Sequence, residues 1–587
     1  MRYPTLYTKE NSRQMVDAFK GYNHNLRIGD GEFFDMKNMT SDHYPVLSPR
    51  KNRGVYASPT SPTGLIAKDA LCYVDGSKFV INEYEVDMGL NDEHKQLISM
   101  GAYVIIMPDK KWVNTITHEW GNIEAHFDNS ESGLDVEFSL CTIDGADRTV
   151  KYHGANEPNE TDNTDLENLD LWIDESSKPH ALKQYSASSK AWVQIATTYI
   201  KISCQGIGAA FEQYDGVTIS GIKADELQDL NASMVIWAKG DDYIVVVGIL
   251  DQVISQPVDI GAISVDRKMP SMDFVIESEN RLWGCKYGEA NNGEVVNEIY
   301  ASKLGDFKNW DCRMNISTDS YTASCGTDGQ FTGAITHLGY PLFFKENCVH
   351  KVYGNYPANF QIQTTACRGV QKGCEKSLAI VNETLFYKAR SGVCAYDGSL
   401  PVEVSYALGD MHYGRAVAGS HGNKYYISMQ EAISPEYSLF VYDIAKGMWH
   451  KEDDLQVDCF CSCRGELYAI SNGEIITMLG SGTTDTMPIQ WMVETGEIGI
   501  TTPDMKYISR ITIRMAMDIG AEVGIYAQYD LNDAWEPICV LTGTSLRSFS
   551  IPVRPRRCDY MKLRIEGFGG ARIYSITKTI EQGSELS

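Results

Sequence analysis

Long apolar runs and helical periodicity are both scarce in this sequence of 587 residues. The longest apolar run, Tyr243 to Leu250, has eight residues, far fewer than a membrane-spanning helix needs. The first ten residues contain no apolar stretch, so we expect neither an export signal nor a membrane span. Apolar residues fall on one side of a possible helix only over residues 11–19, and elsewhere the pattern is of short strands.

Positive charge is also in short supply. The chain has 52 Lys and Arg against 78 Asp and Glu, a formal net charge of −26. A protein that grips nucleic acid by neutralising phosphates needs clustered basic residues, so this balance argues against that class. The apolar content of 43% and charged content of 22% are typical of a globular chain and exclude general disorder.

The 15 cysteines are an odd number spread through a large chain, which is typical of free thiols in a reducing compartment. Cys459, Cys461 and Cys463 alternate along an expected strand. Three thiolates on one strand cannot all reach a single zinc ion without bending it, so we expect small core residues and no metal site. Cys367 and Cys374 have a spacing unlike zinc ribbons; a disulfide is the alternative to free thiols there.

Signatures of common catalytic sites are missing. No phosphate-binding glycine loop, zinc-protease motif or hydrolase serine motif occurs. We therefore expect no catalytic, cofactor-binding or metal-binding residues, and a protein that is not an enzyme. Glycan cleavage stays open as an alternative, because β-propellers host glycosidases and the chain has many carboxylates.

Short strand pairs around a turn recur along the chain, and their high content of glycine and tyrosine favours β-structure. From the second copy onward, the copies begin 59, 43, 40 and 43 residues apart. Antiparallel units repeated every 40–50 residues predict a β-propeller; the alternative is a sandwich built of ordinary hairpins. The six copies begin at Asp75, Asn280, Gly339, Asn382, Gly422 and Gly465.

Two segments interrupt the repeats. Residues 119–260 contain an acidic stretch, 156–175, expected to be a solvated loop, followed by strand-like runs. After residue 484, alternation at 511–517 and 561–565 predicts strands of a sandwich. The expected fold is all-β: a β-propeller with an inserted small β-domain and a C-terminal β-sandwich. The expected domains are a docking arm (1–54), the propeller (55–118 and 261–483), the insertion (119–260) and the sandwich (484–587).

Three motifs resemble the tail nozzle or hub proteins (DNA-stabilisation, tail tubular) of short-tailed bacteriophages, which are β-propellers. The first lies within residues 21–50, the second at 300–310 and the third at 392–398. Residues 491–496 and 555–559 are similar to accessory sandwich domains of related phage proteins. The motif residues with an expected structural role are Arg50, Gly305, Asp306, Asn309, Trp310, Tyr396, Asp397 and Gly398.

The second motif can also be interpreted from its residues. Gly305 permits a positive φ, and Asp306 can accept hydrogen bonds from the backbone of the following turn. Trp310 offers a large apolar face for packing between adjacent blades. These roles are structural and need no catalysis.

The resemblance implies a structural subunit of the virion tail that is assembled in the bacterial cytoplasm. It implies a homo-oligomer, a hexamer in this family, that forms a DNA conduit and retains packaged DNA. Its partners would be head–tail adaptor or tail tube proteins, tail fibres or a distal plug, and genomic DNA passing through without specific binding. The alternative is a tail-associated propeller that binds a receptor glycan or cleaves it.

Overall fold

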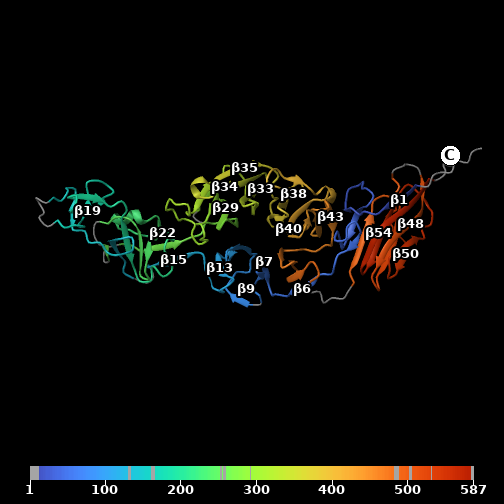
Figure 1. Cartoon of the computed structure of the whole chain (residues 1–587), viewed down its shortest axis with the longest axis horizontal. Helices are drawn as coiled ribbons and strands as arrows, with labels where there is room; N and C mark the ends of the chain where they lie inside the picture. The colour runs from blue at the N-terminus through green and yellow to red at the C-terminus, as the bar shows by residue number, and fades with distance from the viewer. Residues whose placement is uncertain are drawn as a thin grey trace, which may run out of the picture.

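A computed structural model describes residues 12–82, 84–129, 134–159, 166–250, 254–255, 260–290, 293–481, 488–500, 505–530 and 532–582. Strands dominate these residues, and the only helices among them are four short 3-10 turns. Figure 1 shows an elongated chain with a ring of blades in the middle, one β-domain at one end and a β-sandwich at the other. The expected fold class is confirmed.

Seven antiparallel blades of four strands form the propeller within the described residues; six are separate sheets, and the sixth blade is part of a ten-stranded sheet. The first three blades are β7–β10 (Pro62–Lys68, Ala70–Asp75, Lys78–Ile81, Tyr84–Asp87), β11–β14 (Gln96–Met100, Tyr103–Met107, Lys111–Asn114, Trp120–Asn122) and β28–β31 (Phe274–Ser278, Arg281–Glu289, Val295–Ala301, Tyr321–Ser324). The next two are β32–β35 (Gly333–His337, Tyr340–Lys345, Cys348–Tyr353, Gln361–Ala366) and β36–β39 (Ala379–Val381, Thr384–Lys388, Val393–Tyr396, Val402–Glu403). The last two are β40–β43 (Tyr413–His421, Lys424–Glu431, Tyr437–Asp443, Met448–Lys451) and β44–β46 (Cys459–Cys463, Glu466–Ser471, Glu474–Thr477) with β6 (Gly54–Ala57).

The ring closes because a strand that precedes the first blade in the sequence completes the seventh blade. β6 pairs antiparallel with β46 and so becomes the outermost strand of the seventh blade. The innermost strand of that blade, β44, lies beside β7 of the first blade. Because a single four-stranded blade cannot cover both of its own faces, this closure lets every blade pack against two neighbours.

The turns detected as repeats have a common geometry. Five of the six copies mark the turn between the first and second strands of a blade, and each places a residue at positive φ, for example Asn280 (58°) and Gly339 (79°). Tight hairpin turns require positive φ, which glycine and asparagine adopt most readily. The copy at Asp75 marks the second turn of its blade, and the second blade, which turns at Gly101, was not detected in the sequence.

The insertion leaves the ring after β14 and returns before β28. Its entry strand β15 (Ala125–Asp128) pairs antiparallel with its exit strand β27 (Ser264–Arg267), and these two form a stem. The stem sheet also holds β22 (Gly216–Ser220) and β23 (Ser233–Val235), and its apolar core is shared with a second sheet. The second sheet holds β24 (Ala238–Lys239), β25 (Tyr243–Val247), β21 (Tyr199–Ser203), β16 (Glu137–Cys141) and β26 (Ile254–Ser255); η1 spans Asp225–Leu230.

A third sheet stands at the far end of the insertion. It contains β17 (Tyr152–Gly154), β18 (Leu171–Asp174), β19 (Ala181–Ser186) and β20 (Ala191–Gln194). The whole of β18 is buried, although the acidic stretch around it was expected to be a solvated loop. Leu171 and Ile173 explain the difference, because they pack in an apolar cluster beneath the sheet. Part of that stretch, 160–165, lies outside the described residues.

The C-terminal sandwich is continuous with the sixth blade. One sheet runs from β40–β43 through β2 (Gly21–Tyr22), β3 (Glu32–Lys37), β47 (Gln490–Thr495), β53 (Met561–Phe568) and β49 (Glu522–Tyr529) to β50 (Glu536–Thr542). The facing sheet holds β1 (Ser12–Val16), β54 (Ala571–Gln582), β48 (Lys506–Met517), β51 (Arg547–Ile551) and β52 (Arg557–Cys558). The predicted strands at 511–517 and 561–565 are thus found in β48 and β53, with alternating burial.

The first fifty residues differ from the expected separate arm. They supply β1, β2 and β3 to the sandwich and a small hairpin of β4 (Met39–Thr40) and β5 (Ser48–Pro49). The helix expected over 11–19 is wrong: β1 occupies Ser12–Val16 and pairs antiparallel with β54 along its whole length. Asn11 lies outside the described residues.

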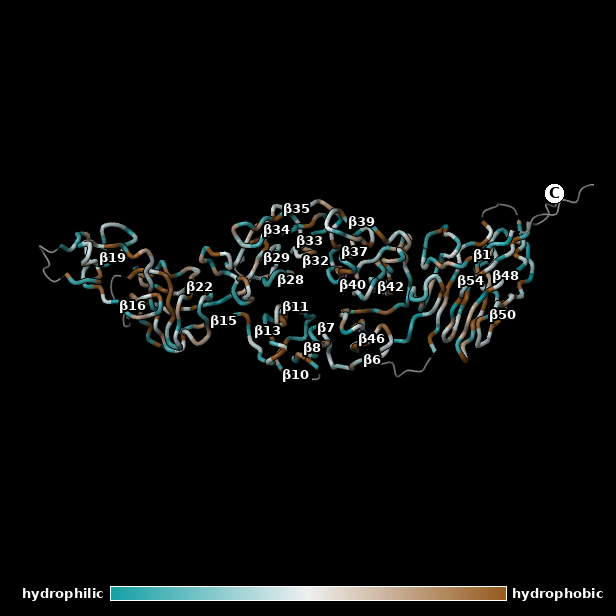
Figure 2. Tube along the Cα trace, viewed as in Figure 1, coloured by the Kyte–Doolittle hydropathy of each residue, from teal (hydrophilic) through white to brown (hydrophobic). Residues whose placement is uncertain are grey.

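Apolar residues are distributed among all three parts of the chain. Figure 2 shows hydrophobic stretches along the strands of the insertion, the propeller and the sandwich. The largest cluster of buried residues joins the fourth to sixth blades to the sandwich, whereas the insertion has a core of its own. In the described part of the chain, no helix is long and apolar enough to span a bilayer.

All 15 cysteines are free thiols, ten of them buried. Burial disfavours the thiolate and raises the pKa of Cys72, for example, to about 11. We expect iodoacetamide under native, non-reducing conditions to label only a few cysteines, and all 15 after denaturation without reductant. Mass spectrometry counts the labels; two or more native disulfides would leave at least four cysteines unlabelled and contradict this prediction.

Candidate functional site

One cavity lies where the blades meet at the centre of the ring. It has a volume of about 480 Å³ and is lined by the inner strands of six blades and by η3 (Glu375–Ser377), which precedes the inner strand of the remaining blade. A volume of this size suits a small ligand. The polar residues at its wall are His94, Lys95, Gln96, Asp273, Glu375 and Lys376.

Two adjacent charged groups in η3 are not committed to ion pairs. Within the described residues, the Glu375 carboxylate makes neither a hydrogen bond nor an ion pair, although it lies close enough to influence the Lys376 charge. The Lys376 ammonium donates to the Asp458 carbonyl, with a distance of 3.1 Å, and faces no carboxylate within ion-pair distance among those residues. Burial lowers the pKa of Lys376. Both groups therefore remain available to a ligand.

On the opposite side, the second blade contributes an imidazole and a buried ammonium. Partial desolvation by neighbouring atoms, together with the charges of Lys376 and Lys95, lowers the pKa of His94 to about 4, so its ring is neutral at pH 7. Its surface stays open to water. Lys95, by contrast, is fully buried and forms an ion pair with Asp109 at 2.6 Å. Of the two side chains His94 and Lys95, only His94 is outside an ion pair and so can bind a ligand readily.

The third blade contributes a carboxylate that is already ionically paired. Asp273 accepts hydrogen bonds from the Lys286 ammonium at 2.9 Å and from the Tyr287 backbone N–H at 3.0 Å. Gln96 bridges the second and third blades, because its amide donates to the Val275 carbonyl at 2.6 Å and accepts from the Val275 N–H at 3.3 Å. These contacts fix the wall of the cavity between the two blades.

The cavity thus combines hydrogen-bonding groups of both signs with apolar walls. Phe274 and Phe460 stand at its lining alongside the polar residues. Glu375 can accept hydrogen bonds, Lys376 can donate them, and the neutral His94 ring can do either. Asp273 and Glu375 are two carboxylates at the wall of one cavity, the residue types that acid–base cleavage of a glycosidic bond requires.

None of these cavity residues was predicted from the sequence. They lie on segments from 94 to 460, and only ring closure brings them together. The available signal was local: polar residues at or beside the first strand of each blade, such as Gln96 in β11 and Asp273 before β28. The sequence does not reveal which strand of each blade lines the propeller axis. That signal therefore does not distinguish the cavity residues from other polar surface residues.

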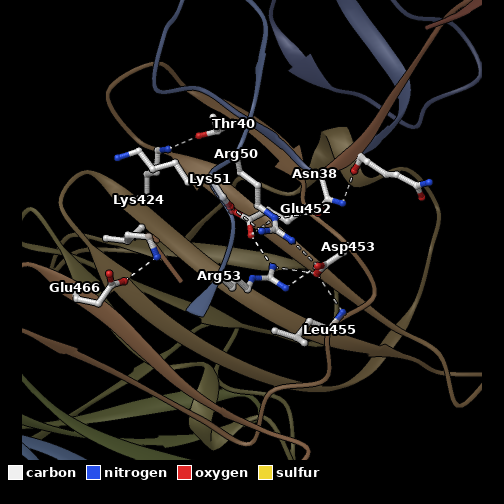
Figure 3. A network of polar contacts seen from close by, with 12 residues as sticks. Asn38, Thr40, Arg50, Lys51, Arg53, Lys424, Glu452, Asp453, Leu455 and Glu466 are labelled. Atoms are coloured by element: carbon white, nitrogen blue, oxygen red, sulfur yellow. Dashed lines mark hydrogen bonds and ion pairs between the residues drawn. The ribbon is translucent and has the colours of Figure 1, made fainter. Parts of the chain in front are cut away.

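Arg50 lies in a buried ion cluster between the propeller and the sandwich (Figure 3). Its guanidinium pairs with Asp453 at 3.1 Å and Glu452 at 3.5 Å, and Arg53 pairs with the same two carboxylates at 2.6 and 2.8 Å. Burial alone would raise the pKa of Asp453, but the two arginines bring it below its usual value. Arg50 also donates to Asn38 at 2.9 Å, so the cluster fastens the chain just before β6.

The motif at 305–310 joins the propeller to the insertion. The Asn309 side chain is fully buried; it donates to Asp215 at 2.9 Å and to Asp306 at 2.5 Å, and accepts from the Gly216 N–H at 2.8 Å. Asp215 in turn pairs with Arg267 at the end of the stem strand β27. We refer to Asp215, Arg267 and Asn309 as the stem lock.

The remaining residues of the motif shape its turn and its packing. Gly305 has a φ of 74°, and Asp306 accepts a hydrogen bond from the Lys308 N–H at 3.0 Å. Trp310 is buried among apolar residues of the second and third blades, including Ile105 and Leu282. The motif therefore lies where two blades and the insertion meet.

The motif at 396–398 closes the strand β38. Tyr396 is buried, and its ring centroid lies 5.6 Å from that of His337 in the neighbouring blade. Asp397 accepts hydrogen bonds from the Ser399 hydroxyl at 2.6 Å and N–H at 3.0 Å, which lower its pKa. Gly398 has a φ of 107°, in the region that favours glycine.

The cysteine-rich strand 459–463 is β44, the inner strand of the seventh blade. Cys459 borders the central cavity, and burial raises the pKa of all three of its cysteines. No group of three or more His, Cys, Asp or Glu residues in the described ranges is arranged to hold a metal ion.

No protein-family model matches the sequence, and no curated protein matches it. Among solved structures, it is similar to an exo-β-1,3-galactanase from Phanerochaete chrysosporium (8% identity, TM-score 0.20, covering 52% of this chain and 94% of that one). It is also similar to the endosialidase of phage phi92, with 10% identity and a TM-score of 0.23 over 77% of this chain and 69% of that one. A third similar structure is an acylaminoacyl peptidase, with 11% identity and a TM-score of 0.23 over 54% of this chain and 55% of that one.

These comparisons correct one expectation. The chain was expected not to be an enzyme, whereas the exo-galactanase and the endosialidase that it matches are enzymes. We therefore drop that expectation. At identities of 8–11% and TM-scores of 0.20–0.23, the likeness assigns neither substrate nor catalytic residues to this chain.

The stem lock makes a testable prediction. Replacing Asn309 with Ala removes its hydrogen bonds and leaves the buried Gly216 N–H without a partner, a cost of about 1–3 kcal/mol. We expect amide exchange to rise in residues 214–217 while the far blades are unaffected. The exposed Asn423→Ala variant is the control; equal exchange in both variants, or a uniform rise along the chain, would contradict the assigned role.

Proposed function

We propose that this protein is a tail-associated virion protein that binds a glycan in the central cavity of its propeller. The observation that carries the binding proposal is the presence of Glu375, Lys376 and His94 at one cavity, none of them held in an ion pair within the described residues. Attachment to a virion tail is supported by the three sequence motifs of the tail-protein resemblance.

The chemistry of the cavity suits a saccharide. Sugar hydroxyls both donate and accept hydrogen bonds, and Glu375 and Lys376 offer an acceptor and a charged donor side by side. Phe274 and Phe460 can cover the apolar C–H surface of a sugar ring. Because Lys376 has no carboxylate partner in the described residues, an acidic sugar has an ammonium to meet there.

Glycan cleavage is a second candidate, favoured by the presence of Asp273 and Glu375 in the same cavity. The Lys286 ammonium keeps Asp273 next to a positive charge, which suits an ionised nucleophile or base. Glu375, which has no such partner among the described residues, would then protonate the leaving oxygen.

The binding proposal is tested with two probes: neutral β-1,3-galactotriose and an anionic trimer of sialic acid, measured by calorimetry. We expect Glu375→Gln and Lys376→Met to weaken binding of at least one probe tenfold or more, since each removes a charged hydrogen-bonding group worth about 1.5–3 kcal/mol. The exposed Lys372→Met variant is the matched control.

The same samples report on cleavage through the release of new reducing ends. Cleavage that is abolished by both Asp273→Asn and Glu375→Gln supports the second candidate, whereas binding without new reducing ends supports the first. If neither probe binds the unaltered protein, or if Lys376→Met binds as tightly as Lys372→Met, the cavity does not have the proposed function.

A nozzle or hub role is compatible with glycan binding and is also proposed. It is favoured by the charge of −26, since an acidic wall lets DNA pass without sticking; six copies would carry roughly −156. The central cavity, at about 480 Å³, is too small to pass a DNA duplex, so the conduit would form between copies. Tail tube or adaptor proteins would bind at one end and fibres or a plug at the other.

For this role, we expect binding of duplex DNA no tighter than about 10⁻⁴ M at physiological salt, because few phosphates would be neutralised. Gel shifts at low and physiological salt measure it, and sedimentation reports whether the chain forms a ring. Tight binding that falls steeply with salt would contradict an acidic conduit.

A further inference from the structure

A second hollow lies far from the propeller axis, on the outer face of the sandwich. It has a volume of about 420 Å³ and crosses five neighbouring strands: β3, β47, β53, β49 and β50. It belongs to the sandwich half of the ten-stranded sheet and shares no residue with the central cavity. Its lining is Lys37, Gln490, Trp491, Met492, Glu522, Gly524, Tyr526, Val540, Glu566, Gly567 and Phe568.

A missing side chain creates the floor of this hollow. Met492, Glu566, Gly524 and Val540 are paired in register across four strands and therefore form one row on the outer face. Gly524 leaves a gap in that row. Because its φ lies outside the positive region, the backbone at this position would accept another residue, so the gap is not needed for a turn.

An aromatic ring from the next row covers the gap. A Cβ placed on Gly524 would lie 3.0 Å from Cε2 and 3.2 Å from the hydroxyl oxygen of Tyr526. The ring therefore reaches over the glycine and stays partly exposed to solvent. On the other side of the gap, Phe568 has 39% of its surface exposed. Two aromatic rings thus border a shallow floor.

The rim of the hollow is polar. The side chains of Gln490, Glu522 and Lys37 are exposed, and within the described residues none of them makes a side-chain hydrogen bond or ion pair. Glu566 is 42% exposed and makes a 3.4 Å contact with Arg564. The rim therefore has two carboxylates, Glu522 and Glu566, against one ammonium, Lys37. This negative balance disfavours anionic ligands.

We propose that this hollow is a binding site for a neutral oligosaccharide built of pyranose rings. A pyranose ring has an apolar C–H face, which Tyr526 and Phe568 can pack against, and a perimeter of hydroxyls, which Glu522, Glu566 and Gln490 can bind. Neutral sugars fit the acidic rim. The proposal goes beyond the glycan-binding function of the central cavity and does not depend on it.

The test uses the full-length chain and three neutral probes: cellohexaose, chitohexaose and β-1,3-galactotriose. Binding is measured by calorimetry, and saturation-transfer NMR reports which sugar protons touch the protein. Tyr526→Ala removes the ring, Tyr526→Phe keeps it, and Gly524→Ala fills the gap and displaces the ring. Tyr406→Ala removes another tyrosine, a residue that is 79% exposed and lies far from the hollow in the sequence.

We expect at least one probe to bind, with Tyr526→Ala and Gly524→Ala each weakening it tenfold or more. Tyr526→Phe and Tyr406→Ala should stay within threefold of the unaltered protein. Thermal melting of Gly524→Ala and Tyr526→Ala should match that of Tyr406→Ala, so that lost binding reflects the site and not the fold.

Other outcomes overturn the inference. If no probe binds, or if Tyr526→Ala binds as well as the unaltered chain, the hollow is not a saccharide site. Its exposed aromatic rings would then be candidates for contact with a protein partner. Loss of binding in Glu375→Gln with full binding in Tyr526→Ala would overturn this inference while leaving the central cavity as the glycan site. The reverse pattern would support the sandwich site and contradict the central one.

Discussion

Closure of the ring is the constraint on which the other features depend. β6 must reach back across more than four hundred residues of sequence to pair with β46. Directly before β6, Arg50 and Arg53 are held against Glu452 and Asp453 in a cluster that is mostly shielded from water. Removing one partner from such a cluster leaves a buried charge uncompensated, which is far more costly than a lost surface ion pair. The central cavity exists only because the blades on both sides of this closure stay together.

The two ends of the chain are attached to the ring in different ways. The insertion connects through a two-stranded stem, and polar contacts between Asn309, Asp215 and Arg267 secure it. The sandwich connects through a sheet that passes without interruption from the sixth blade into β2 and β3. At that passage Gly21 has a φ of 84°, and a Cβ there would lie 2.3 Å from the Trp449 carbonyl oxygen, so only glycine allows β2 to approach β43.

Local patterns in the sequence identified most of the propeller because each hairpin turn needs a residue that accepts positive φ. Asn382 and Gly422 were detectable for that reason. The blade that turns at Gly101 was missed, although its second strand carries one aromatic residue, Tyr103, as the copies at Asp75 and Gly465 do. The segment containing Met15 was misread as helical because its partner strand, β54, lies at the opposite end of the chain. The cavity residues escaped prediction for a related reason: tertiary closure, not spacing, assembles them.

The shared sheet has a consequence for how the molecule comes apart. Backbone hydrogen bonds run from the sixth blade into the sandwich, and one apolar cluster fills both. These regions therefore form one cooperative unit, in which loosening of either exposes the apolar surface of the other. The insertion, with its separate core and narrow stem, is free to open by itself. A pulling force on the far tip would therefore reach the ring through the stem strands β15 and β27 and the stem lock, and not through the sheet that joins the ring to the sandwich.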